Sequence, residues 1–481
     1  MPPSLSSPLH CAAVDLGATS GRVIVGTWEN DQLTTQEVHR FPNGLRSLSG
    51  HDYWDIAGLW TEVQTGLAAA AKLLPKGQTL ASVGVDTWGV DYVLLNDAGR
   101  VVFPTHAYRD DRTQRGLTRL RNTRAAYARI YAATGIPAIF LNSSLQLAET
   151  IESCPAITDL AAHCLFLPDY FNYLLSGRMA NGVSIASTSQ LLDVHRDEWS
   201  QATLKYFRIP PQWLSKPIKS GTKLGRVRQQ PGLEKTTTIA VPGHDTTCAY
   251  DAMPASPDGT DIFLSSGTWS LVGFESDHPL LGAEAQAANV ANDRTGRGGY
   301  RPLVNVIGLW LLEGILGSFS SRPTSATGWK TLIKTAASLP APKRLLDVTD
   351  PAFANPSSMK AAIDAQLKRH GARPPRDLTR YVRLICDSLG QGHADVVSRF
   401  TRLADREFKR ILMVGGGAKN ALLCQATANA AGLPVLAYQL EGSAIGNLAN
   451  QLIALRAVKD LSAFRATLIT TLKPKIYHPQ H

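Results

Sequence analysis

The sequence lacks any long run of apolar residues. Its most apolar stretch, residues 67–74, is interrupted by Lys72, whereas a helix that crosses a bilayer needs about 20 apolar residues in succession. The opening residues MPPSLSSPLH also lack the basic region and the apolar region of a secretory signal. These absences predict a protein that has no membrane partner and works in the cytoplasm.

Paired cysteines and two common nucleotide motifs are missing as well. None of the 6 cysteines belongs to a CxxC pair, so neither a zinc ribbon nor a disulfide framework is expected. Buried free thiols are the favoured interpretation. No GxxxxGK[ST] stretch occurs, and no GxGxxG follows a strand, which argues against P-loop and Rossmann folds.

Acidic residues are fewer than basic residues. There are 39 Asp and Glu against 49 Lys and Arg, which gives a net charge of +10. Such a charge could attract nucleic acid, but the basic residues are scattered along the chain rather than gathered in a block. A basic solvated surface is therefore favoured, no nucleic-acid partner is expected, and the excess charge would help to gather anionic nucleotides.

The chain has 481 residues, which is too many for one core, so two large domains are expected. Residues 11–41 alternate apolar strands with polar turns, which predicts a three-stranded meander. Residues 55–74 carry apolar side chains at helical spacing. Short buried strands are expected at 81–86 and 92–97. The resulting order β-β-β-α-β differs from the simple alternation of doubly wound folds.

The opening pattern returns in the second half of the sequence. Residues 260–280 again predict a strand, a Gly-Thr turn and a strand. A helical stretch at 376–404 then leads to a strand at 410–414. The middle, roughly 115–235, is mostly helical. We therefore expect two related halves with a boundary in the turn-rich segment near 248–260.

Two turns and one glycine run have the chemistry of phosphate sites. The turn at 15–21 combines glycines, which let backbone N–H groups approach an anion, with the hydroxyls of Thr19 and Ser20. Asp15 stands at a strand end, where it could hold Mg²⁺ through water. The turn at 265–270 repeats this pattern, and the glycines at 415–417 lie between a strand and a helix. Each of the two turns alone could be a plain hairpin, and the glycines a flexible turn, although that interpretation is the less favoured one for the glycines. The duplication of the turns favours a phosphate clamp.

Two polar segments are candidates for the acceptor site. Asp245, in PGHDTT, stands near the predicted junction, where a kinase needs a carboxylate to accept a proton from the attacking hydroxyl. In isolation it would be interpreted as a turn residue or helix cap. Asp86 and Trp88, in GVDTWG, suit sugar recognition, because hydroxyls need polar partners beside an aromatic surface. A glycine turn with a core tryptophan explains the same segment equally well.

Taken in order, these segments resemble the FGGY carbohydrate kinases, and within that family the bacterial rhamnulokinases. The resemblance covers roughly residues 11–455. Its motifs are DLGATSGR, GVDTWGVDYVLL, AYRDDRT, PDYFNYLLSG, GHDT, LSSGTWSLVGFES, VIGLWLLE and VGGGAKN. It implies an α/β protein with two actin-like (ribonuclease H-like) domains, at 9–250 and 258–460, and an active site in the cleft between them.

The resemblance also implies a reaction and a set of site residues. The reaction is transfer of the γ-phosphate of ATP, with Mg²⁺, to the 1-hydroxyl of L-rhamnulose, with Asp245 as proton acceptor. The residues implied to contact ATP are Ala18, Thr19, Ser20, Gly21, Arg22, Thr268, Glu313 and Gly416. The residues implied to line the sugar site are Gly84, Asp86, His244, Asp245, Thr246 and Asn305, with Asp15 as the metal ligand.

The sequence departs from the family pattern at two of its positions. Glu313 stands where such kinases usually carry Gln, and a carboxylate there would repel phosphate. Gly243 precedes His244 where Ser is common. Neither departure removes the residues expected to perform the chemistry.

Other functions fit parts of the same pattern. The same chemistry on L-fuculose or L-xylulose is one alternative, because sugar stereochemistry depends on a few hydroxyl partners that the sequence does not place. A non-catalytic ATP-binding sensor on this fold is another, although it would not need a catalytic base. A monomer is favoured over a dimer.

Overall fold

The computed structural model describes residues 8–480, which fold into two compact units. Within the described residues, the first comprises 8–254, Ser276–Pro302 and Glu441–Thr470. The second comprises Ala255–Glu275, Leu303–Leu440 and 471–480. The prediction that no secretory signal is present concerns the opening residues, and 1–7 lie outside the described part. None of the helices within 8–480 is both long and apolar enough to cross a membrane.

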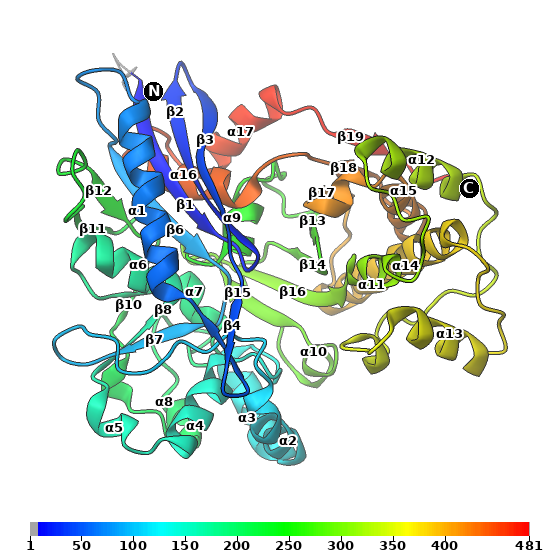
Figure 1. Cartoon of the computed structure of the whole chain (residues 1–481), viewed down its shortest axis with the longest axis horizontal. Coiled ribbons are helices and arrows are strands. Elements are labelled where there is room, and N and C mark those ends of the chain that lie inside the picture. Colours follow the sequence, from blue (N-terminus) through cyan, green and yellow to red (C-terminus); the bar gives the residue numbers. More distant parts are fainter. Residues whose placement is uncertain (1–7, 481) are drawn as a thin grey trace. The chain divides into compact units, whose positions relative to one another are not determined.

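The first unit is built on a six-stranded sheet with the order β11-β12-β6-β1-β2-β3 (Figure 1). Its first three strands form the antiparallel meander that the sequence predicts. β6 pairs parallel with β1 and with β12, and β11 closes the sheet as an antiparallel edge. The strands are β1 Leu9–Leu16, β2 Ser20–Glu29, β3 Gln32–Pro42, β6 Ser82–Thr87, β11 Lys223–Arg226 and β12 Thr237–Ile239.

The second large sheet has the order β15-β16-β14-β13-β17-β18-β19, with β15 at Ala291–Arg294. β13, β14 and β16 are antiparallel neighbours, β17 pairs parallel with β13 and with β18, and β19 is an antiparallel edge. The strands are β13 Asp261–Ser266, β14 Trp269–Phe274, β16 Tyr300–Ile307, β17 Arg410–Val414, β18 Val435–Ala437 and β19 Lys475–Tyr477. Apart from the additional edge strand β15, the sequence of pairings is the same as in the first sheet, so the two sheets share one topology, as the repeated turn pattern predicts.

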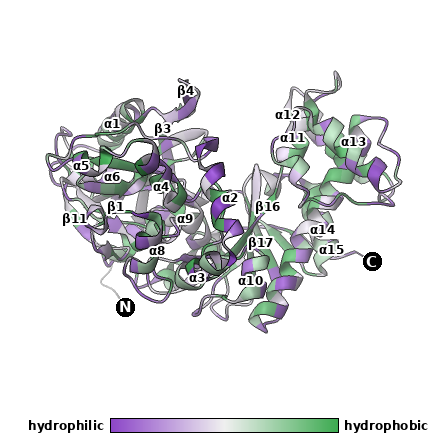
Figure 2. Cartoon of the chain, turned by 90° about the horizontal axis from the view of Figure 1, so that it is seen from below, coloured by the Kyte–Doolittle hydropathy of each residue, from purple (hydrophilic) through white to green (hydrophobic). Residues whose placement is uncertain are grey.

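Helices surround the sheet of the first unit. The predicted helix α1 begins after Asp55, whose side chain accepts a hydrogen bond from Gly58 N at 2.8 Å, and it buries Leu59, Val63 and Leu67. Helix α2 is strongly hydrophilic at the surface (Figure 2). The helices of this unit are α1 Ile56–Leu73, η1 Asp111–Thr113, α2 Gln114–Asn122, α3 Arg124–Thr134, α4 Ser143–Ser153, α5 Ile157–Leu160, α6 Leu167–Ser176, α7 Val183–Ser187, α8 Gln201–Phe207, η2 Pro211–Trp213, α9 Asp245–Asp251, α10 Ala283–Ala287, α16 Gly442–Ala454 and α17 Leu461–Thr471.

The second unit is dominated by the 27-residue helix α14, which the sequence predicts almost to the residue. Its side chain Phe400 packs edge-on against Phe274 of β14, with ring centroids 5.1 Å apart. The helices of this unit are α11 Trp310–Leu316, α12 Ala326–Ala337, η3 Pro351–Phe353, α13 Met359–Arg369, α14 Leu378–Ala404, η4 Gly416–Lys419 and α15 Ala421–Ala431.

Several short strands of the first unit were not predicted. A hairpin of two four-residue strands precedes α1, so the order is not the simple β-β-β-α-β expected. The middle of the chain is mostly helical, as predicted, but it also contributes short strands. These smaller elements are β4 Leu45–Leu48, β5 His51–Trp54, β7 Tyr92–Leu95, β8 His163–Phe166, β9 Asn181–Gly182, β10 Pro217–Ile218 and β15 Ala291–Arg294.

Candidate active site

Three charged side chains lie side by side across the sheet of the first unit. Asp15 on β1 is paired in register with Arg22 on β2 and with Asp86 on β6. Arg22 Nε lies 3.0 Å from Asp15 Oδ2, and Asp15 and Asp86 are both buried. They stand near the carboxyl ends of parallel strands, where α/β folds bind their ligands.

Burial gives this pair of carboxylates unusual protonation behaviour. Burial raises the pKa of Asp15 to about 6, against the lowering effect of Arg22, and the negative charges of Asp245 and Glu441 raise it further. Burial, followed by the charge of Asp15, also raises the pKa of Asp86 well above its ordinary value. Asp86 Oδ1 accepts no hydrogen bond from the residues that the structure describes. The raised pKa values therefore reflect burial of two neighbouring carboxylates.

The predicted phosphate turn joins β1 to β2. Gly17 N donates to Ser20 O at 3.0 Å, and Asn43 N donates to Thr19 O at 3.0 Å. The side chain of Asn43 also donates to Gly17 O at 2.9 Å, which ties the turn to the residue after β3. Thr19 remains exposed. Asn43 therefore holds the backbone of the turn, while the side chain of Thr19 is exposed to solvent.

Gly21 is required here for packing. A Cβ at this position would lie 2.3 Å from the ring of Phe41, so no other residue fits while that ring stays in the core. Arg22, the next residue, is held by Asp15 and by an ion pair with Glu441. The local sequence therefore fixes the turn through one buried ring and one doubly paired arginine.

Asp245 is the first residue of α9, and His244 is its N-cap. Asp245 Oδ1 accepts hydrogen bonds from Thr246 N at 2.6 Å and from the Thr246 hydroxyl at 3.2 Å. Oδ2 accepts none from the described residues, and the side chain is 27% exposed. One carboxylate oxygen is therefore anchored, and the other is available to a substrate hydroxyl.

His244 links Asp245 to a second carboxylate that sequence reasoning missed. His244 Nδ1 lies 3.1 Å from Asp293 Oδ2, and its Nε2 lies 3.6 Å from Asp245 Oδ1. Burial disfavours the charged imidazole, but the hydrogen bond and charge of Asp293, with the charge of Asp245, outweigh it and raise the pKa of His244. Burial raises the pKa of Asp245, against the charge of His244 and the hydrogen bonds of Thr246.

Gly243, a departure from the family pattern, has a structural reason. A Cβ at this position would lie 2.7 Å from Pro168 Cγ and 3.1 Å from Ile185 Cβ. Gly243 O also accepts a hydrogen bond from Thr87 N at 2.8 Å, which holds the segment before Asp245 against the end of β6. A serine here would press on Pro168, so the loop depends on glycine.

Helix α16 supplies polar residues that sequence reasoning also missed. Asn447 Nδ2 donates to Asp86 Oδ2 at 2.6 Å and to Gly84 O at 3.1 Å. Gln451, one turn later, donates to Asn447 Oδ1 at 2.7 Å and to Ala12 O at 2.9 Å. A Cβ at Gly84 would lie 2.6 Å from Asn447 Oδ1, so Gly84 lets the helix approach. The signal available in the sequence was the group of amide side chains in the stretch GNLANQL, whose other residues are apolar or glycine.

Asp91 is the centre of a second unpredicted network. Its Oδ2 accepts hydrogen bonds from the ring nitrogens of Trp54 at 2.6 Å and Trp88 at 2.9 Å. Its Oδ1 accepts one from Gln146 at 3.0 Å. The two indole rings lie 4.2 Å apart between centroids. Burial raises the pKa of Asp91 to about 6 against these bonds, and the network fixes the orientation of Trp88, the predicted aromatic surface.

The second predicted phosphate turn joins β13 to β14. Gly308 N donates to Thr268 O at 3.1 Å, and Leu309 N donates to Gly267 O at 2.8 Å. A Cβ at Gly308 would lie 2.5 Å from Gly267 O, so this contact needs glycine. The turn is thereby fixed against the start of α11, with Trp269 beside it 46% exposed.

The glycine run packs against the same turn. Gly415 has a positive φ of 85°, which suits glycine, and a Cβ there would lie 2.5 Å from Ser266 O. A cavity of about 1360 Å³ is lined by Gly416 and Glu313, among others. The structure thus brings together two of the residues predicted to contact ATP, although the sequence separates them.

The predicted site residues fall in both units. The first unit holds Asp15, Ala18, Thr19, Ser20, Gly21, Arg22, Gly84, Asp86, His244, Asp245 and Thr246. The second holds Thr268, Asn305, Glu313 and Gly416. Asn305 is exposed on β16 opposite Leu271 of β14.

Comparison with known proteins assigns the family. Residues 11–250 match the N-terminal domain, and residues 262–455 match the C-terminal domain, of the FGGY family of carbohydrate kinases. The chain belongs to this family. It is an ATP-dependent sugar kinase, as the sequence motifs predict.

Relatives and solved structures agree with this assignment. A rhamnulokinase of Klebsiella pneumoniae subsp. pneumoniae is 38% identical over 97% of this chain and 94% of its own length. A rhamnulokinase of Bacteroides thetaiotaomicron is 36% identical over 97% of this chain and 95% of its own length. A gluconate kinase from Lactobacillus acidophilus superposes with a TM-score of 0.80 at 16% identity, covering 98% of this chain and 94% of that one. A xylulose kinase from Rhodospirillum rubrum gives 0.79 at 18%, with the same coverage. The predicted two-domain sugar kinase fold is confirmed.

Proposed function

We propose that this sugar kinase transfers the γ-phosphate of ATP to the 1-hydroxyl of L-rhamnulose. The choice of sugar is supported by the two rhamnulokinases that are 38% and 36% identical to this chain over nearly its full length. The chemistry is supported most directly by Asp245, because its Oδ2 is free of protein hydrogen bonds within the described residues while Oδ1 is anchored. A base needs this combination of fixed position and access.

Asp245 acts in this proposal as the proton acceptor for the sugar hydroxyl. His244 and Thr246 hold its carboxylate in place, and Asp293 holds His244. Asp86 and Asn305 would bind other sugar hydroxyls, and Gly84 on β6 would line the sugar site. Phosphoryl transfer depends mainly on positioning, so the fixed geometry around Asp245 matters as much as its basicity.

ATP is bound in this proposal through the paired turns and the large cavity of the second unit. The turn from Ala18 to Arg22 and the turn at Thr268 would bind phosphate oxygens through backbone N–H groups, hydroxyls and the Arg22 guanidinium. Gly416 would contact the adenosine. Glu313 lines the same cavity as Gly416, and it is better suited to a ribose hydroxyl than to a phosphate.

The buried carboxylates fit a magnesium ion. Mg²⁺ prefers hard oxygen ligands and binds kinases through one or two carboxylates with waters and phosphate oxygens. Asp15 would hold it, and the unpartnered Oδ1 of Asp86 would accept one of its waters. When bound, the ion would neutralise phosphate charge. Burial raises the pKa of Asp15 to about 6, and a cation bound beside this carboxylate would lower that pKa.

Two parts of the proposal concern the whole protein. It works in the cytoplasm, where ATP is available, and it works as a monomer. Size-exclusion chromatography with light scattering tests the second part directly.

A coupled ADP-release assay across a panel of sugars tests the proposed substrate. L-rhamnulose should give the highest kcat/KM, above L-fuculose and L-xylulose, and the aldose L-rhamnose should give little activity. A wrong epimer leaves buried polar groups unpaired, at about 1–3 kcal/mol for each group. Asp245→Asn serves as the control for contaminating kinases. A clear preference for another ketose would overturn the substrate and leave the sugar kinase assignment intact.

A further inference from the structure

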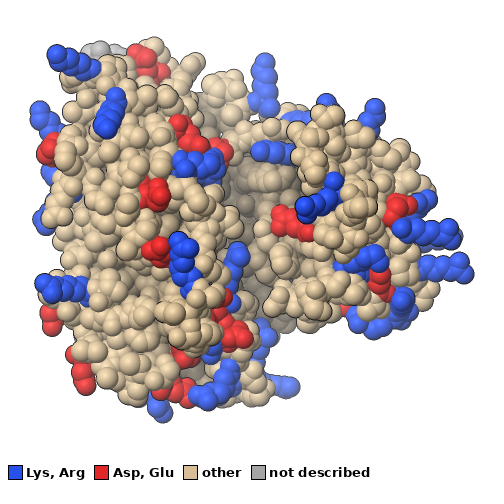
Figure 3. Space-filling model, viewed as in Figure 1, with Lys and Arg blue, Asp and Glu red and all other residues tan. Residues whose placement is uncertain are grey.

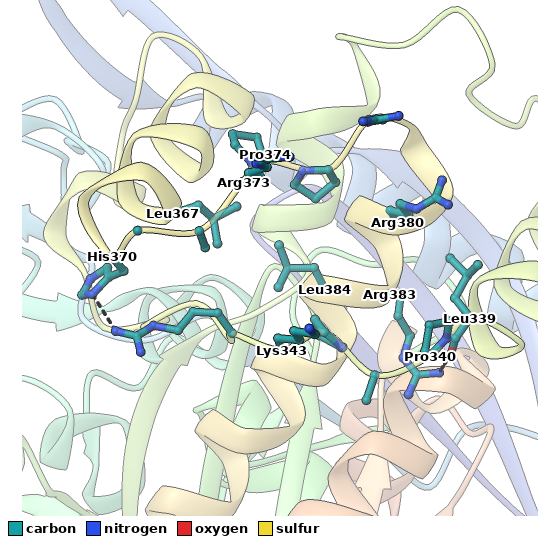
Figure 4. A pocket seen from close by; sticks show the side chains of 17 residues that line it. Leu339, Pro340, Lys343, Leu367, His370, Arg373, Pro374, Arg380, Arg383 and Leu384 are labelled. Carbon is teal, nitrogen blue, oxygen red and sulfur yellow. Dashed lines mark hydrogen bonds between the residues drawn. The ribbon is translucent and has the colours of Figure 1, made fainter.

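A basic pocket lies in the second unit, formed by three segments of the chain (Figure 4). The segments are the loop after α12, the end of α13 with the loop that follows, and the first turns of α14. The pocket has a volume of about 760 Å³, and no Asp or Glu lines it. Its ionisable lining residues are Lys343, Arg344, His370, Arg373, Arg376, Arg380 and Arg383.

Four of the Lys and Arg side chains lack a counter-charge. Arg380 is paired with Asp377, and Arg383 with Asp387. Lys343, Arg344, Arg373 and Arg376 form no ion pair with any described residue. Lys and Arg side chains also project from the second unit in Figure 3. Gathering like charges around one pocket raises the free energy of the folded state, so an anion bound there would stabilise it.

Two of the basic side chains are held by hydrogen bonds. Arg383 Nε lies 2.7 Å from Asp387 Oδ2, and its Nη1 donates to the carbonyl oxygens of Ala337 and Leu339 at 2.9 Å. Arg344 Nη2 lies 3.2 Å from His370 Nδ1, which serves as the acceptor (Figure 4). The bonds of Arg383 fix its guanidinium and leave Nη2 for a phosphate oxygen, so little freedom is lost when phosphate binds.

The rest of the lining is apolar and stiff. Leu367 and Leu384 lie between Lys343 on one side and Arg373 and Arg380 on the other (Figure 4). Prolines in the lining restrict the backbone, so the pocket is formed before a ligand arrives. They are Pro340, Pro342, Pro374 and Pro375. The lining suits a ligand with a carbon body and charged groups at two ends.

We propose that this pocket binds a small organic bisphosphate, either a sugar bisphosphate or a nucleoside diphosphate. The volume lies within the range of about 300–1,000 Å³ that is usual for small-molecule sites. The cations on two sides of an apolar floor match two phosphate groups joined by a carbon body. Of the lining residues, Arg383 alone also lines the cavity that contains Glu313 and Gly416. The pocket is therefore separate from the residues proposed for ATP.

Isothermal titration of the full chain with glucose 1,6-bisphosphate, and separately with ADP, tests the proposal. The double variant Arg373→Ala/Arg376→Ala removes two exposed, unpaired cations and should fold like the parent. It should weaken binding of the preferred probe at least about tenfold, because two charge-assisted contacts are lost. In this proposal ADP would bind both the catalytic site and the basic pocket. The variant should remove only the ADP binding that belongs to the basic pocket.

The matched control is Arg322→Ala/Lys368→Ala, which changes the net charge equally at exposed positions outside the lining. It should leave affinity within about twofold of the parent, because neither exposed side chain lines the pocket. An equal loss of affinity in the test and control variants would mean diffuse attraction to a basic protein and would overturn the proposal. The proposal would also be overturned if neither probe bound at the basic pocket. Tighter binding of a single-stranded oligonucleotide, lost in the same test variant, would replace the small ligand with a nucleic acid.

Discussion

Asp245 has one carboxylate oxygen bound by its own helix N-terminus and one left for the substrate. Asp245→Asn keeps the size of the side chain and one acceptor oxygen but cannot take a proton at neutral pH. The value of kcat should fall by about 10²–10⁴, with MgATP affinity and melting temperature nearly unchanged. Steady-state kinetics, nucleotide titration and thermal unfolding of the variant and parent check this. Near-normal kcat would eliminate Asp245 as the base, and an unfolded variant would make it a structural residue.

Asp169 should make stability depend on pH. It is 4% exposed, and both its oxygens lie 3.1 Å from Gly182 N. Burial raises its pKa to about 8, against this hydrogen bond. Between about pH 4 and pH 8 the folded chain keeps a proton that the unfolded chain has lost. The contribution of Asp169 to the free energy of unfolding is therefore fully present below about pH 4. It declines by about 1.4 kcal/mol for each pH unit up to about pH 8.

Asp169→Asn cannot titrate, so its stability relative to the parent should increase steadily from pH 5 to pH 8. Paired thermal melts at each pH give the difference. Asp31→Asn, in an exposed turn, is the control, and its difference from the parent should stay flat. A flat difference for Asp169→Asn as well would show that the buried carboxyl does not hold its proton.

At the scale of elements, helices α9 and α16 cross at a glycine. A Cβ on Gly446 would lie 1.8 Å from Cys248 O, so even alanine must push the two helices apart. Gly446→Ala should destabilise the protein by about 1–3 kcal/mol or more, and it should lower kcat because α9 begins at Asp245. Gly317→Ala is the control, since nothing lies within 4 Å of its Cβ. Thermal melts and steady-state kinetics of both variants test this prediction. A Gly446→Ala variant with the stability and kcat of the parent would show that α9 and α16 are not closely packed at this glycine.

The elements themselves were predictable to different degrees. The meander, α1, α14 and the strand before the glycine run follow from hydrophobic periodicity, which is a local property of the chain. The hairpin at Leu45–Leu48 and His51–Trp54 was missed because both strands are short and largely polar. Its alignment depends on contacts with distant residues, such as the hydrogen bond from Trp54 N to Thr105 O at 2.9 Å.

At the scale of the whole molecule, the first unit is assembled from three separate stretches of sequence. A fragment of residues 1–254 would lack α16 and therefore the amides that bind Asp86, Gly84 and Ala12. We expect it to lose cooperative unfolding, because buried polar groups would lose their partners and α9 would lose its packing. Near-UV circular dichroism and thermal melts against the full chain measure this. A fragment with a sharp transition would show that α16 is dispensable for folding.

The net charge of +10 also acts at this scale. In the sequence the basic residues are dispersed, and that observation favoured a generally basic surface. In the fold, residues from 343 to 383 converge on one pocket without acidic neighbours in its lining. Dispersion along the chain therefore does not imply dispersion in space, since a loop and two helices bring these cations together.

The sequence by itself determined the two related halves and the family, and it predicted the phosphate turns and Asp245 as a candidate base. Each of these depends on short segments whose residue types carry their own chemistry. Tertiary structure alone decided that Asp293 holds His244, that Asp91 joins two tryptophans, and that Asn447 reaches Asp86 across 361 positions of sequence. The physical reason is that buried polar groups must find partners wherever the fold places them, and no local pattern specifies a partner so far along the chain.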